Sequence, residues 1–378
     1  MRVAVVAEFY PRRHDPVLGV WAHRQALAAA AAGAEVSVFV LHRLVPPRRE
    51  LGDLWALARQ PSTARLDGLA VRYVRYVSPP RGRAYARWGA WAAPALRRAL
   101  QRDGPFDLIH AHNAVPAADA VLRAAIGAPM VVSIHGGDVL WTSSRVPGGR
   151  EAVGRALREA RLVLANSHLI ASLAHEHGAA RTRVVHLGAD VPPPRAQPRE
   201  GPPLIATVAH LVARKRHGDV LEALAKLPGV RYLVIGEGPE RSRLQAWARE
   251  LGLADRVEFT GQLAPAEAVR RASEAWCFVM PSTEEAFGVA YIEAMAAGIP
   301  AIGCAGEPGP EEIATAGGGI ELVEPRSPDA LAACLRRLLG DEPARSELGA
   351  RARATVEAQF TWRHCGEQTL AAYEEALA

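Results

Sequence analysis

Short, continuous apolar runs alternate with longer segments rich in alanine, leucine and arginine, and this alternation limits the fold more than any other feature of the sequence. Such runs, about 4–8 residues long, are typical of strands that are buried on both faces of a parallel sheet. In the first half they cover residues 2–7, 35–40, 70–77, 107–110, 130–134, 162–165 and 183–186. Helices are predicted between them, over residues 20–32, 86–101, 116–125 and 149–160. The first half therefore predicts a doubly wound α/β domain.

A proline-rich segment, residues 191–203, interrupts the alternation. Six of its 13 residues are proline, which continues neither a helix nor a central strand. The alternation resumes with apolar runs at residues 204–209, 230–235, 257–260, 276–280, 300–303 and 320–323. We predict one domain over residues 1–190, a linker over 191–203 and a second α/β domain over 204–359. Two doubly wound domains are expected to face a cleft and to bind ligands at the carboxyl ends of their strands.

The composition excludes several classes of protein. The 378 residues are ample for two packed cores. No apolar run approaches the roughly 18 residues of a membrane-spanning helix, and the N-terminal apolar run is too short for a signal peptide. The four cysteines form no Cys-x-x-Cys pair, which favours reduced thiols and a cytoplasmic location over a metal site. They are Cys277, Cys304, Cys334 and Cys365.

The net charge of +5 hides a difference between the two halves. Residues 1–190 contain 25 arginines, no lysine and 14 acidic residues, whereas the remaining residues contain 20 basic and 26 acidic side chains. This asymmetry favours an anionic partner for the first half. The sequence has no recognised nucleic-acid-binding motif, so we expect no nucleic-acid partner.

Arginine and aromatic residues are mixed between residues 42 and 98. This stretch has twelve arginines and only three acidic residues, Glu50, Asp53 and Asp67. The arginines are Arg43, Arg48, Arg49, Arg59, Arg65, Arg72, Arg75, Arg81, Arg83, Arg87, Arg97 and Arg98, and the aromatic residues are Trp55, Tyr73, Tyr76, Tyr85, Trp88 and Trp91. Such a mixture suits the boundary between lipid headgroups and acyl chains. We therefore expect transient contact with an anionic, cytoplasmic membrane face, the alternative being arginines that are merely solvated.

The loop that follows the strand at residues 276–280 carries the strongest functional signal. Gly288 allows the backbone to approach a ligand closely, and a helix beginning near it directs free N–H groups outward, an arrangement that binds phosphate. Glu285 before the helix and Glu293 within it are placed to accept hydrogen bonds from hydroxyl groups. A capped helix with two surface glutamates is the alternative. The glycine fingerprint of dinucleotide-binding proteins is absent after the first strand, where Glu8-Phe9-Tyr10-Pro11 stands, so NAD is disfavoured.

This segment, Glu-x-Phe-Gly-x-x-x-x-Glu-Ala-Met-Ala-x-Gly-x-Pro from Glu285 onward, resembles the signature of family 4 glycosyltransferases, which have the GT-B fold of two Rossmann-like domains. The resemblance extends over almost the whole chain. It includes Ile-His-Gly-Gly-Asp at residues 134–138, Leu-Gly-Ala-Asp at 187–190, Val-Ile-Gly-Glu-Gly at 234–238 and Val-Glu-Phe-Thr-Gly at 257–261. Together these motifs are specific, although each alone is weak.

The resemblance implies roles for the residues of this signature. Glu285 is expected to hold hydroxyl groups of the donor sugar, and Glu293 the ribose hydroxyls. The backbone of Phe287, Gly288 and Val289 is expected to contact the sugar or the diphosphate.

The resemblance also implies roles in the loops of the first domain. His135 is expected beside the transferred sugar, and Gly19 in the loop that approaches the phosphates. Asp138 is expected to line the cleft, with capping of the segment that follows it as the alternative.

One loop departs from the family pattern. The family has Gly-Arg-Leu-x-x-x-Lys-Gly after the first strand of the second domain, where Arg and Lys neutralise the diphosphate. Here Lys215 fits, His210 stands in place of the arginine, and Arg214 or Arg216 is a possible source of the missing charge. A structural role for His210 is the alternative.

Membership of the family implies a retaining transferase that moves a sugar from a nucleotide diphosphate-sugar to an acceptor that the sequence does not identify. No Asp-x-Asp follows a strand, so we expect no metal ion and no cofactor besides the donor. The terminal segment, residues 360–378, resembles the family's last helix, which crosses back to the first domain. A nucleotide-sugar epimerase on the same fold and a non-catalytic sugar- or nucleic-acid-binding protein are the alternatives.

Overall fold

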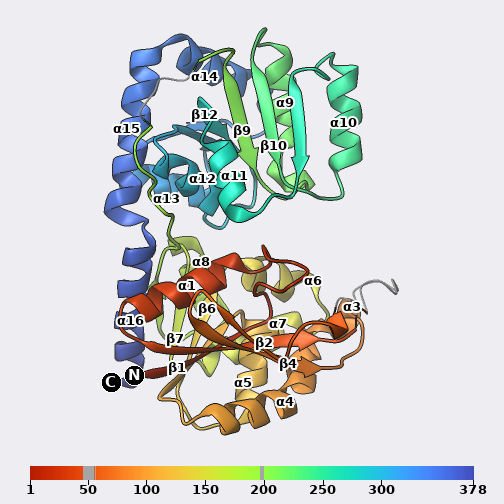
Figure 1. Cartoon of the computed structure of the whole chain (residues 1–378), viewed down its shortest axis with the longest axis vertical. Helices are drawn as coiled ribbons and strands as arrows, with labels where there is room; N and C mark the ends of the chain where they lie inside the picture. The colour runs from red at the N-terminus through yellow and green to blue at the C-terminus, as the bar shows by residue number, and fades with distance from the viewer. Residues whose placement is uncertain (46–54, 56, 196–199) are drawn as a thin grey trace. The chain divides into compact units, whose positions relative to one another are not determined.

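The computed structural model describes residues 1–45, 55, 57–195 and 200–378, which divide into two compact units. Unit 1 consists of Met1–Leu187 and Trp362–Ala378, and unit 2 of Gly188–Thr361. Both are α/β units with a central sheet (Figure 1). The chain enters unit 2 just before the proline-rich segment, whose described residues, 191–195 and 200–203, contain neither helix nor strand.

Unit 1 is built on an eight-stranded sheet with the strand order β3-β4-β2-β1-β5-β6-β7-β8. Neighbouring strands are parallel except β3 and β4, which are antiparallel. The order reverses between β1 and β5, and the carboxyl ends of strands at such a switch point are where α/β sheets bind ligands. The strands are β1 Arg2–Ala7, β2 Glu35–Arg43, β3 Thr63–Leu66, β4 Leu69–Tyr76, β5 Leu108–His112, β6 Met130–Ile134, β7 Leu162–Ala165 and β8 Thr182–Val184.

The hairpin of β3 and β4 was not predicted from the sequence. Its two-residue turn, Asp67-Gly68, has φ values of +45° and +89°. Asp-Gly is a preferred pair for a turn that needs two positive φ angles, so the signal was present. The short β3 has no continuous apolar run, because it lies at the edge of the sheet.

The helices of unit 1 include the C-terminal helix α16, which packs against α1. A Cβ atom on Gly366 would lie 2.2 Å from the carbonyl oxygen of Ala28, so glycine permits this close approach. Tyr373 of α16 also lies 2.7 Å from His110 Nδ1 of β5. The helices and helical turns are α1 Val20–Ala31, α3 Arg81–Ala84, η1 Tyr85–Arg87, α4 Trp88–Asp103, η2 Ala114–Ala118, α5 Asp119–Ala124, η3 Gly137–Thr142, α6 Ser143–Arg145, α7 Gly149–Arg158, α8 His168–Glu176 and α16 Trp362–Leu377.

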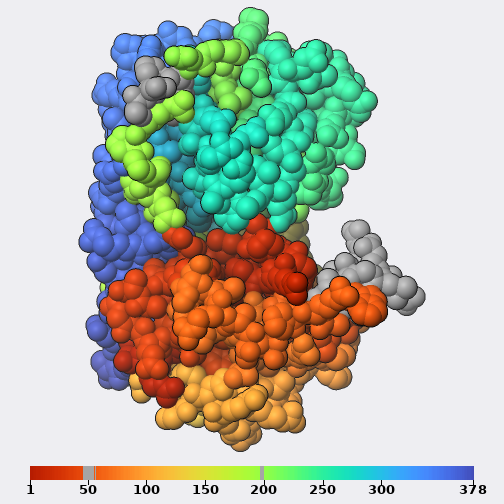
Figure 2. All heavy atoms as spheres, viewed as in Figure 1, coloured from red at the N-terminus to blue at the C-terminus, as the bar shows by residue number. Residues whose placement is uncertain are grey.

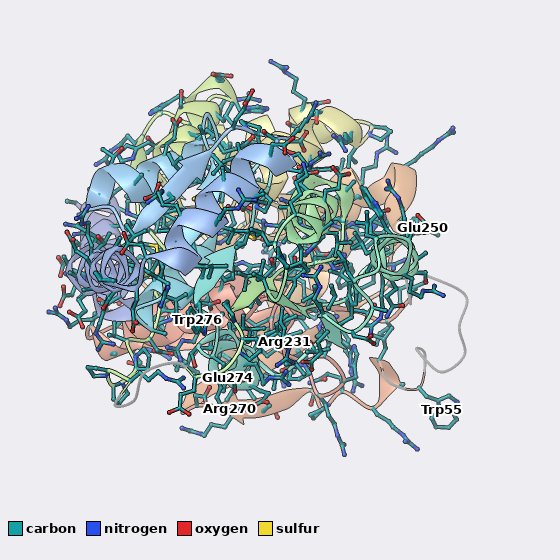
Figure 3. The ribbon with its side chains drawn as sticks, turned by 90° about the horizontal axis from the view of Figure 1, so that it is seen from above. Trp55, Arg231, Glu250, Arg270, Glu274 and Trp276 are labelled. Atoms are coloured by element: carbon teal, nitrogen blue, oxygen red, sulfur yellow. The ribbon has the colours of Figure 1, made fainter. Side chains whose placement is uncertain are left out.

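The predicted mixture of arginine and aromatic side chains is only partly a surface feature. Tyr73, Tyr76, Tyr85 and Trp88 are at most 5% exposed, because they pack in the core of unit 1, so their expected place at a lipid boundary is wrong. Trp91 is 54% exposed and Trp55 is 67% exposed, and Trp55 points away from the unit (Figure 3). In the space-filling view, the orange atoms of the β3–β4 and α3 region lie on the surface (Figure 2). Arg48, Arg49, Glu50 and Asp53 lie outside the described residues.

Unit 2 has a parallel six-stranded sheet in the order β11-β10-β9-β12-β13-β14. The order reverses between β9 and β12, so the loops after these two strands meet at the switch point. The strands are β9 Leu204–Val208, β10 Arg231–Ile235, β11 Val257–Gly261, β12 Cys277–Val279, β13 Ala301–Cys304 and β14 Ile320–Val323. The strands and the flanking helices contribute buried apolar side chains to separate hydrophobic clusters of this unit.

The helices of unit 2 follow the strands in regular alternation. They are η4 Ala213–Lys215, α9 His217–Ala225, α10 Arg241–Glu250, α11 Pro265–Ala272, α12 Val289–Ala296, α13 Pro308–Ala316, α14 Pro328–Gly340 and α15 Glu342–Gln359. All four cysteines are buried, and none of them forms a disulfide. Among the described residues, no helix is long and apolar enough to cross a membrane.

Candidate active site

Lys215 and Glu285 form a buried ion pair at the switch point of unit 2. Lys215 is the last residue of η4, which follows β9, and Glu285 lies in the loop between β12 and α12. The two residues are 9% and 8% exposed, and Lys215 Nζ donates a hydrogen bond to Glu285 Oε2. Nζ also lies 3.6 Å from Met280 Sδ. A buried ion pair contributes little to stability, because desolvation offsets its attraction, so its position favours a functional role.

The surroundings of Glu285 keep its carboxylate charged. Burial alone would raise its pKa, but the charge and hydrogen bond of Lys215, the charge of Arg214 and a hydrogen bond from Ser282 together hold the pKa below its ordinary value. Ser282 Oγ donates to Glu285 Oε2 at 3.0 Å. Among the described residues none donates to Oε1, which remains available to accept hydrogen bonds from hydroxyl groups.

The loop after Glu285 opens into the N-terminus of α12. Gly288 is the N-cap residue with a φ of +91°, and a Cβ atom there would lie 2.4 Å from the ring of Tyr291. Glycine is therefore required by both the backbone angle and the space. The Phe287 side chain is buried 5.5 Å from the ring of Phe360, so the side chain is not presented to a ligand. The first N–H groups of α12 have no partner within the helix and favour an anion.

Arg216 occupies the position where a glycine is expected after Lys215. Its φ is +54°, and its guanidinium group binds both carboxylate oxygens of Asp219, at 2.9 and 2.7 Å. This pairing holds an arginine in a backbone conformation that normally favours glycine. The carbonyl oxygen of Arg214 accepts the N–H of Thr283 at 2.9 Å, which ties the Lys215 segment to the Glu285 loop.

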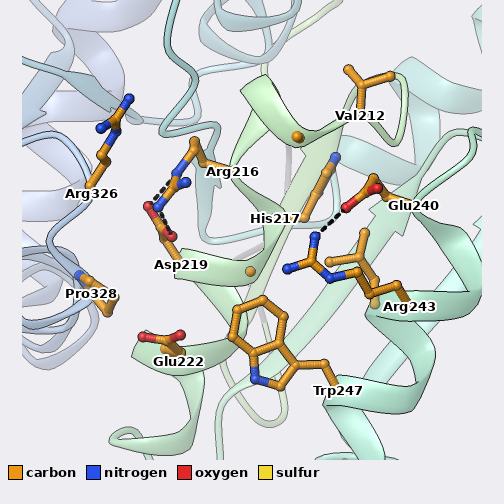
Figure 4. A pocket seen from close by; sticks show the side chains of 13 residues that line it. Val212, Arg216, His217, Asp219, Glu222, Glu240, Arg243, Trp247, Arg326 and Pro328 are labelled. Atoms are coloured by element: carbon orange, nitrogen blue, oxygen red, sulfur yellow. Dashed lines mark hydrogen bonds and ion pairs between the residues drawn. The ribbon is translucent and has the colours of Figure 1, made fainter.

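A cavity of about 200 Å³ lies between α9, α10 and the start of α14. Arg216 and its partner Asp219 form part of its lining. Trp247 lies against Gly218, where a Cβ atom would be 2.3 Å from the indole ring (Figure 4). Neither Lys215 nor Glu285 lines this cavity, so it is separate from the ion pair.

In unit 1, His135 follows β6 and contacts a second histidine. Its Nε2 lies 3.2 Å from Nδ1 of His112, and the two rings are stacked with centroids 5.4 Å apart. Burial lowers the pKa of His135 to about 4, so its imidazole is neutral at neutral pH. His110, two residues before His112, is held between Tyr373 and Ser133, each at 2.7 Å.

Gly19 is the N-cap residue of α1, with a φ of +67°. A Cβ atom there would lie 2.2 Å from the carbonyl carbon and oxygen of Phe9. The glycine therefore allows the loop after β1 to pack against the start of α1.

Asp138 is a buried cap for a neighbouring loop. It is 1% exposed and accepts hydrogen bonds from Asn113 Nδ2 at 3.0 Å and from the N–H of Ala114 at 3.1 Å. It therefore organises the loop after β5, whereas the sequence pointed to the cleft or to the segment that follows it. Burial raises its pKa to about 6.

Sequence reasoning also missed Glu8, a buried carboxylate after β1 that accepts a hydrogen bond from Tyr85 at 2.7 Å.

Only some of the residues that were predicted for the site in unit 2 contact one another. Lys215 and Glu285 are in direct contact, and the charge of Arg214 acts on Glu285. His210 is exposed in the segment after β9, and among the described residues Lys215 and Glu285 have no hydrogen bond or ion pair with its side chain. Glu293 lies half-buried within α12. The partners Ser282, Met280 and Tyr291 were not singled out from the sequence, although all three belong to or adjoin the signature segment.

Comparison with known proteins decides the family. Residues 18–191 match the family model of glycosyltransferase family 4, and residues 193–355 match that of glycosyl transferases group 1. A D-inositol 3-phosphate glycosyltransferase of Gordonia bronchialis is 32% identical over 76% of this chain and 70% of its own length. The chain belongs to glycosyltransferase family 4. A 2-deoxystreptamine glucosyltransferase of Streptomyces kanamyceticus is also 31% identical, over 76% of this chain and 83% of its own.

Solved structures agree on the fold of this glycosyltransferase. Sucrose-phosphate synthase from Thermosynechococcus elongatus superimposes with a TM-score of 0.79 at 21% identity, covering 99% of this chain and 98% of that chain. Anabaena HepE, in complex with UDP and glucose, superimposes with a TM-score of 0.74 at 19% identity, covering 99% of both chains. The predicted GT-B class is therefore confirmed. Family membership also makes the chain a glycosyltransferase enzyme, rather than an epimerase or a non-catalytic binding protein.

Proposed function

We propose that this glycosyltransferase takes a sugar from a nucleotide diphosphate-sugar and transfers it to an acceptor hydroxyl with retention of the anomeric configuration. The observation that carries the proposal is the buried Lys215–Glu285 pair at the switch point of unit 2, beside the N-terminus of α12. One charged group of each sign, with free helix N–H groups next to them, suits a ligand that has both phosphates and hydroxyls.

Each group then has a distinct part in binding the donor. Lys215 and the N-terminus of α12 stabilise the negative charge that develops on the departing diphosphate. Glu285 accepts hydrogen bonds from sugar hydroxyls through the oxygen that Lys215 leaves unoccupied. Glu293, in the next turns of α12, holds the ribose. We propose that these groups and Arg214 meet the charge of the diphosphate without a metal ion.

Named relatives support the class of donor. Anabaena HepE has a structure in complex with UDP-glucose. A Corynebacterium glutamicum relative, 27% identical over 63% of this chain and 68% of its own, is named a GDP-mannose-dependent mannosyltransferase. These relatives use different bases and sugars, so the proposal is limited to the nucleotide diphosphate-sugar class.

We propose that the configuration is retained because the acceptor attacks the sugar carbon on the same face from which the diphosphate departs. The carbon–oxygen bond to the diphosphate breaks, the acceptor oxygen bonds to the same carbon, and the acceptor proton passes to the departing phosphate oxygen. For His135, which is neutral at neutral pH, and for the Gly19 loop, the proposed roles rest on the family resemblance alone. His210, which is exposed after β9, is proposed to donate to the diphosphate, with a structural role as the alternative.

Incubation with a panel of nucleotide sugars tests the proposal. We expect one or a few donors to be consumed, by transfer or slow hydrolysis, with release of a nucleoside diphosphate that mass spectrometry detects. NMR of the product should show the anomeric configuration of the donor, and a chelator should leave the rate unchanged. Inverted product, or no turnover of any donor, would contradict the proposal.

We also propose that unit 1 makes transient contact with an anionic membrane face, where a lipid-linked acceptor would be found. Arg83, Arg87 and Trp91 are exposed on the α3–α4 segment. An exposed aromatic side chain among cations suits the interface between headgroups and acyl chains.

A further inference from the structure

Glu307 occupies the N-cap position of α13 without capping its own helix. An N-cap side chain ordinarily accepts a hydrogen bond from an N–H of the first turn, and within the described part of unit 2 Glu307 makes no such bond. Its Oε2 instead accepts the N–H of Glu285 at 3.0 Å. The carboxylate is therefore turned toward the loop that carries the partner of Lys215.

The peptide that Glu307 holds follows a residue in an unfavourable conformation. Glu284 has a φ of +58°, in the left-handed region that residues other than glycine seldom adopt. Such a conformation persists only where the surroundings hold it. A second contact comes from Gly309 of α13, where a Cβ atom would lie 2.5 Å from the carbonyl oxygen of Phe287. The start of α13 thus contacts the loop at two places, Glu285 and Phe287.

The charges around Glu307 show which of its interactions is favourable. Burial and the neighbouring carboxylates of Glu285 and Glu284 raise its pKa, and the backbone N–H groups of the same two residues lower it, leaving the pKa above its ordinary value. Burial raises the pKa of Cys304 on β13 to about 12 and holds that of Tyr291 on α12 well above its ordinary value, so both are neutral at neutral pH. A nearby carboxylate disfavours the charge of Glu285. The favourable contribution is therefore the hydrogen bond to the backbone.

We propose that Glu307 is a positioning residue for the transfer reaction, which fixes the Glu284–Glu285 peptide so that the Glu285 carboxylate stays on Lys215 and Ser282 and presents its other oxygen to the donor. This proposal rests on the proposed function of the Lys215–Glu285 pair. Glu307 acts through Glu285 and does not itself touch the substrate.

Glu307→Ala and Glu307→Gln test this role in the full-length enzyme. Alanine removes the acceptor, and we expect kcat to fall at least tenfold with a smaller change in KM for the donor, because an interaction that positions the reacting groups is lost. Glutamine keeps one neutral acceptor and should recover part of that loss. Wild-type kcat should fall toward the glutamine level as the pH is lowered and Glu307 is protonated, while the glutamine variant stays flat over the same range. The pKa of Glu307 is raised and that of Glu285 is lowered. Glu307 is therefore protonated at a higher pH than Glu285, so its effect on kcat can be observed separately.

A readout that needs no substrate accompanies the kinetics. Hydrogen exchange in peptides covering residues 281–290 should be faster in Glu307→Ala than in wild type. Glu311→Ala is the matched control, because Glu311 on the same helix accepts the N–H of Gly306 at 2.6 Å and, among the described residues, its side chain has no hydrogen bond to the Glu285 loop. It should leave kcat and exchange in residues 281–290 unchanged.

Two results would overturn the proposal. One is a Glu307→Ala variant with wild-type kcat and exchange, and the other is equal losses in Glu307→Ala and Glu311→Ala. Failure of the wild type to turn over any donor would instead refute the proposed function, while faster exchange in Glu307→Ala alone would still support the positioning contact.

Discussion

Lys215 and Glu285 are each unfavourable to bury alone, and each is tolerated because the other is present. Removing one member of a buried ion pair is costly, since it leaves an uncompensated charge. Arg216 and Asp219 show a related dependence, in which a side-chain pair holds a positive φ at a residue other than glycine. At the scale of residues, a functional experiment must therefore separate loss of chemistry from loss of folding.

Lys215→Ala should lower kcat by about 10²–10³-fold, equivalent to ~2.7–4 kcal/mol of transition-state stabilisation, because it removes a charge placed for the leaving diphosphate. Initial rates at saturating donor measure this. The melting temperature should also fall, because Glu285 is left unpaired, and Glu285→Gln in the same chain should restore stability without restoring activity. Lys226→Ala is the control, since the other lysine of the chain pairs with Asp329 at the surface. Near-normal turnover of Lys215→Ala would remove Lys215 from the mechanism.

Asp138 should give unit 1 a measurable pH dependence. Its pKa is raised to about 6 in the folded state from 3.8, so the folded state binds more protons between these values, and the stabilisation is lost as the pH rises through 6. Buried His110 and His135, whose pKa values are lowered to about 3 and about 4, act in the opposite direction. The effect of Asp138 is therefore measured as the difference in melting temperature between wild type and a variant that lacks the carboxylate. Between pH 7 and pH 5, the melting temperature of wild type should rise relative to that of Asp138→Asn, and a constant difference would contradict the raised pKa.

At the scale of elements, buried parallel strands were predictable and edge elements were not. β1, β6 and β7 begin and end where their apolar runs do, because both faces of each strand are buried. β3 pairs with one strand only and has no apolar run. Its Asp-Gly turn is therefore the only sequence signal that indicates the strand. Contacts between distant segments, such as Glu307 with Glu285, leave no pattern in either segment, since each is satisfied by a residue from elsewhere in the chain.

The packing of α16 on α1 depends on a glycine. Gly366→Ala would place a methyl group 2.2 Å from the carbonyl oxygen of Ala28, and such overpacking typically costs about 1–3 kcal/mol. We expect a lower melting temperature and faster hydrogen exchange in α1 and α16. Gly340→Ala, at the end of α14, meets nothing within 4 Å and should be neutral or slightly stabilising. Equal effects of the two substitutions would mean that the α1–α16 contact is not tight.

At the scale of the whole molecule, the first half of the chain carries a net positive charge and the second half a net negative charge. Much of the arginine in unit 1 is structural. Arg43 is 8% exposed and binds Ser78, and Arg81 lies 4.2 Å from the ring of Tyr85. Arg83, Arg87 and Trp91 are different, because they are exposed at spacings of four residues on the α3–α4 segment. Arg83 lies in α3, Arg87 in η1 and Trp91 in α4, so three successive helical segments each expose one of these side chains, and these three form the part of the arginine-rich stretch that suits a membrane surface.

Vesicle co-sedimentation measures the contact with an anionic surface. Wild type should bind vesicles that contain an anionic lipid, bind neutral vesicles weakly, and dissociate as salt is raised, because each basic residue near such a surface contributes about 1 kcal/mol that counterions screen. Arg83→Glu with Arg87→Glu should abolish binding, and Trp91→Ala should weaken it while preserving its salt dependence. Arg150→Glu with Arg249→Glu changes the net charge equally at exposed sites elsewhere and should bind as wild type does. If the two pairs lose binding equally, only net charge matters, and if wild type binds no anionic vesicle at low salt, the acceptor is reached without a membrane contact through this face.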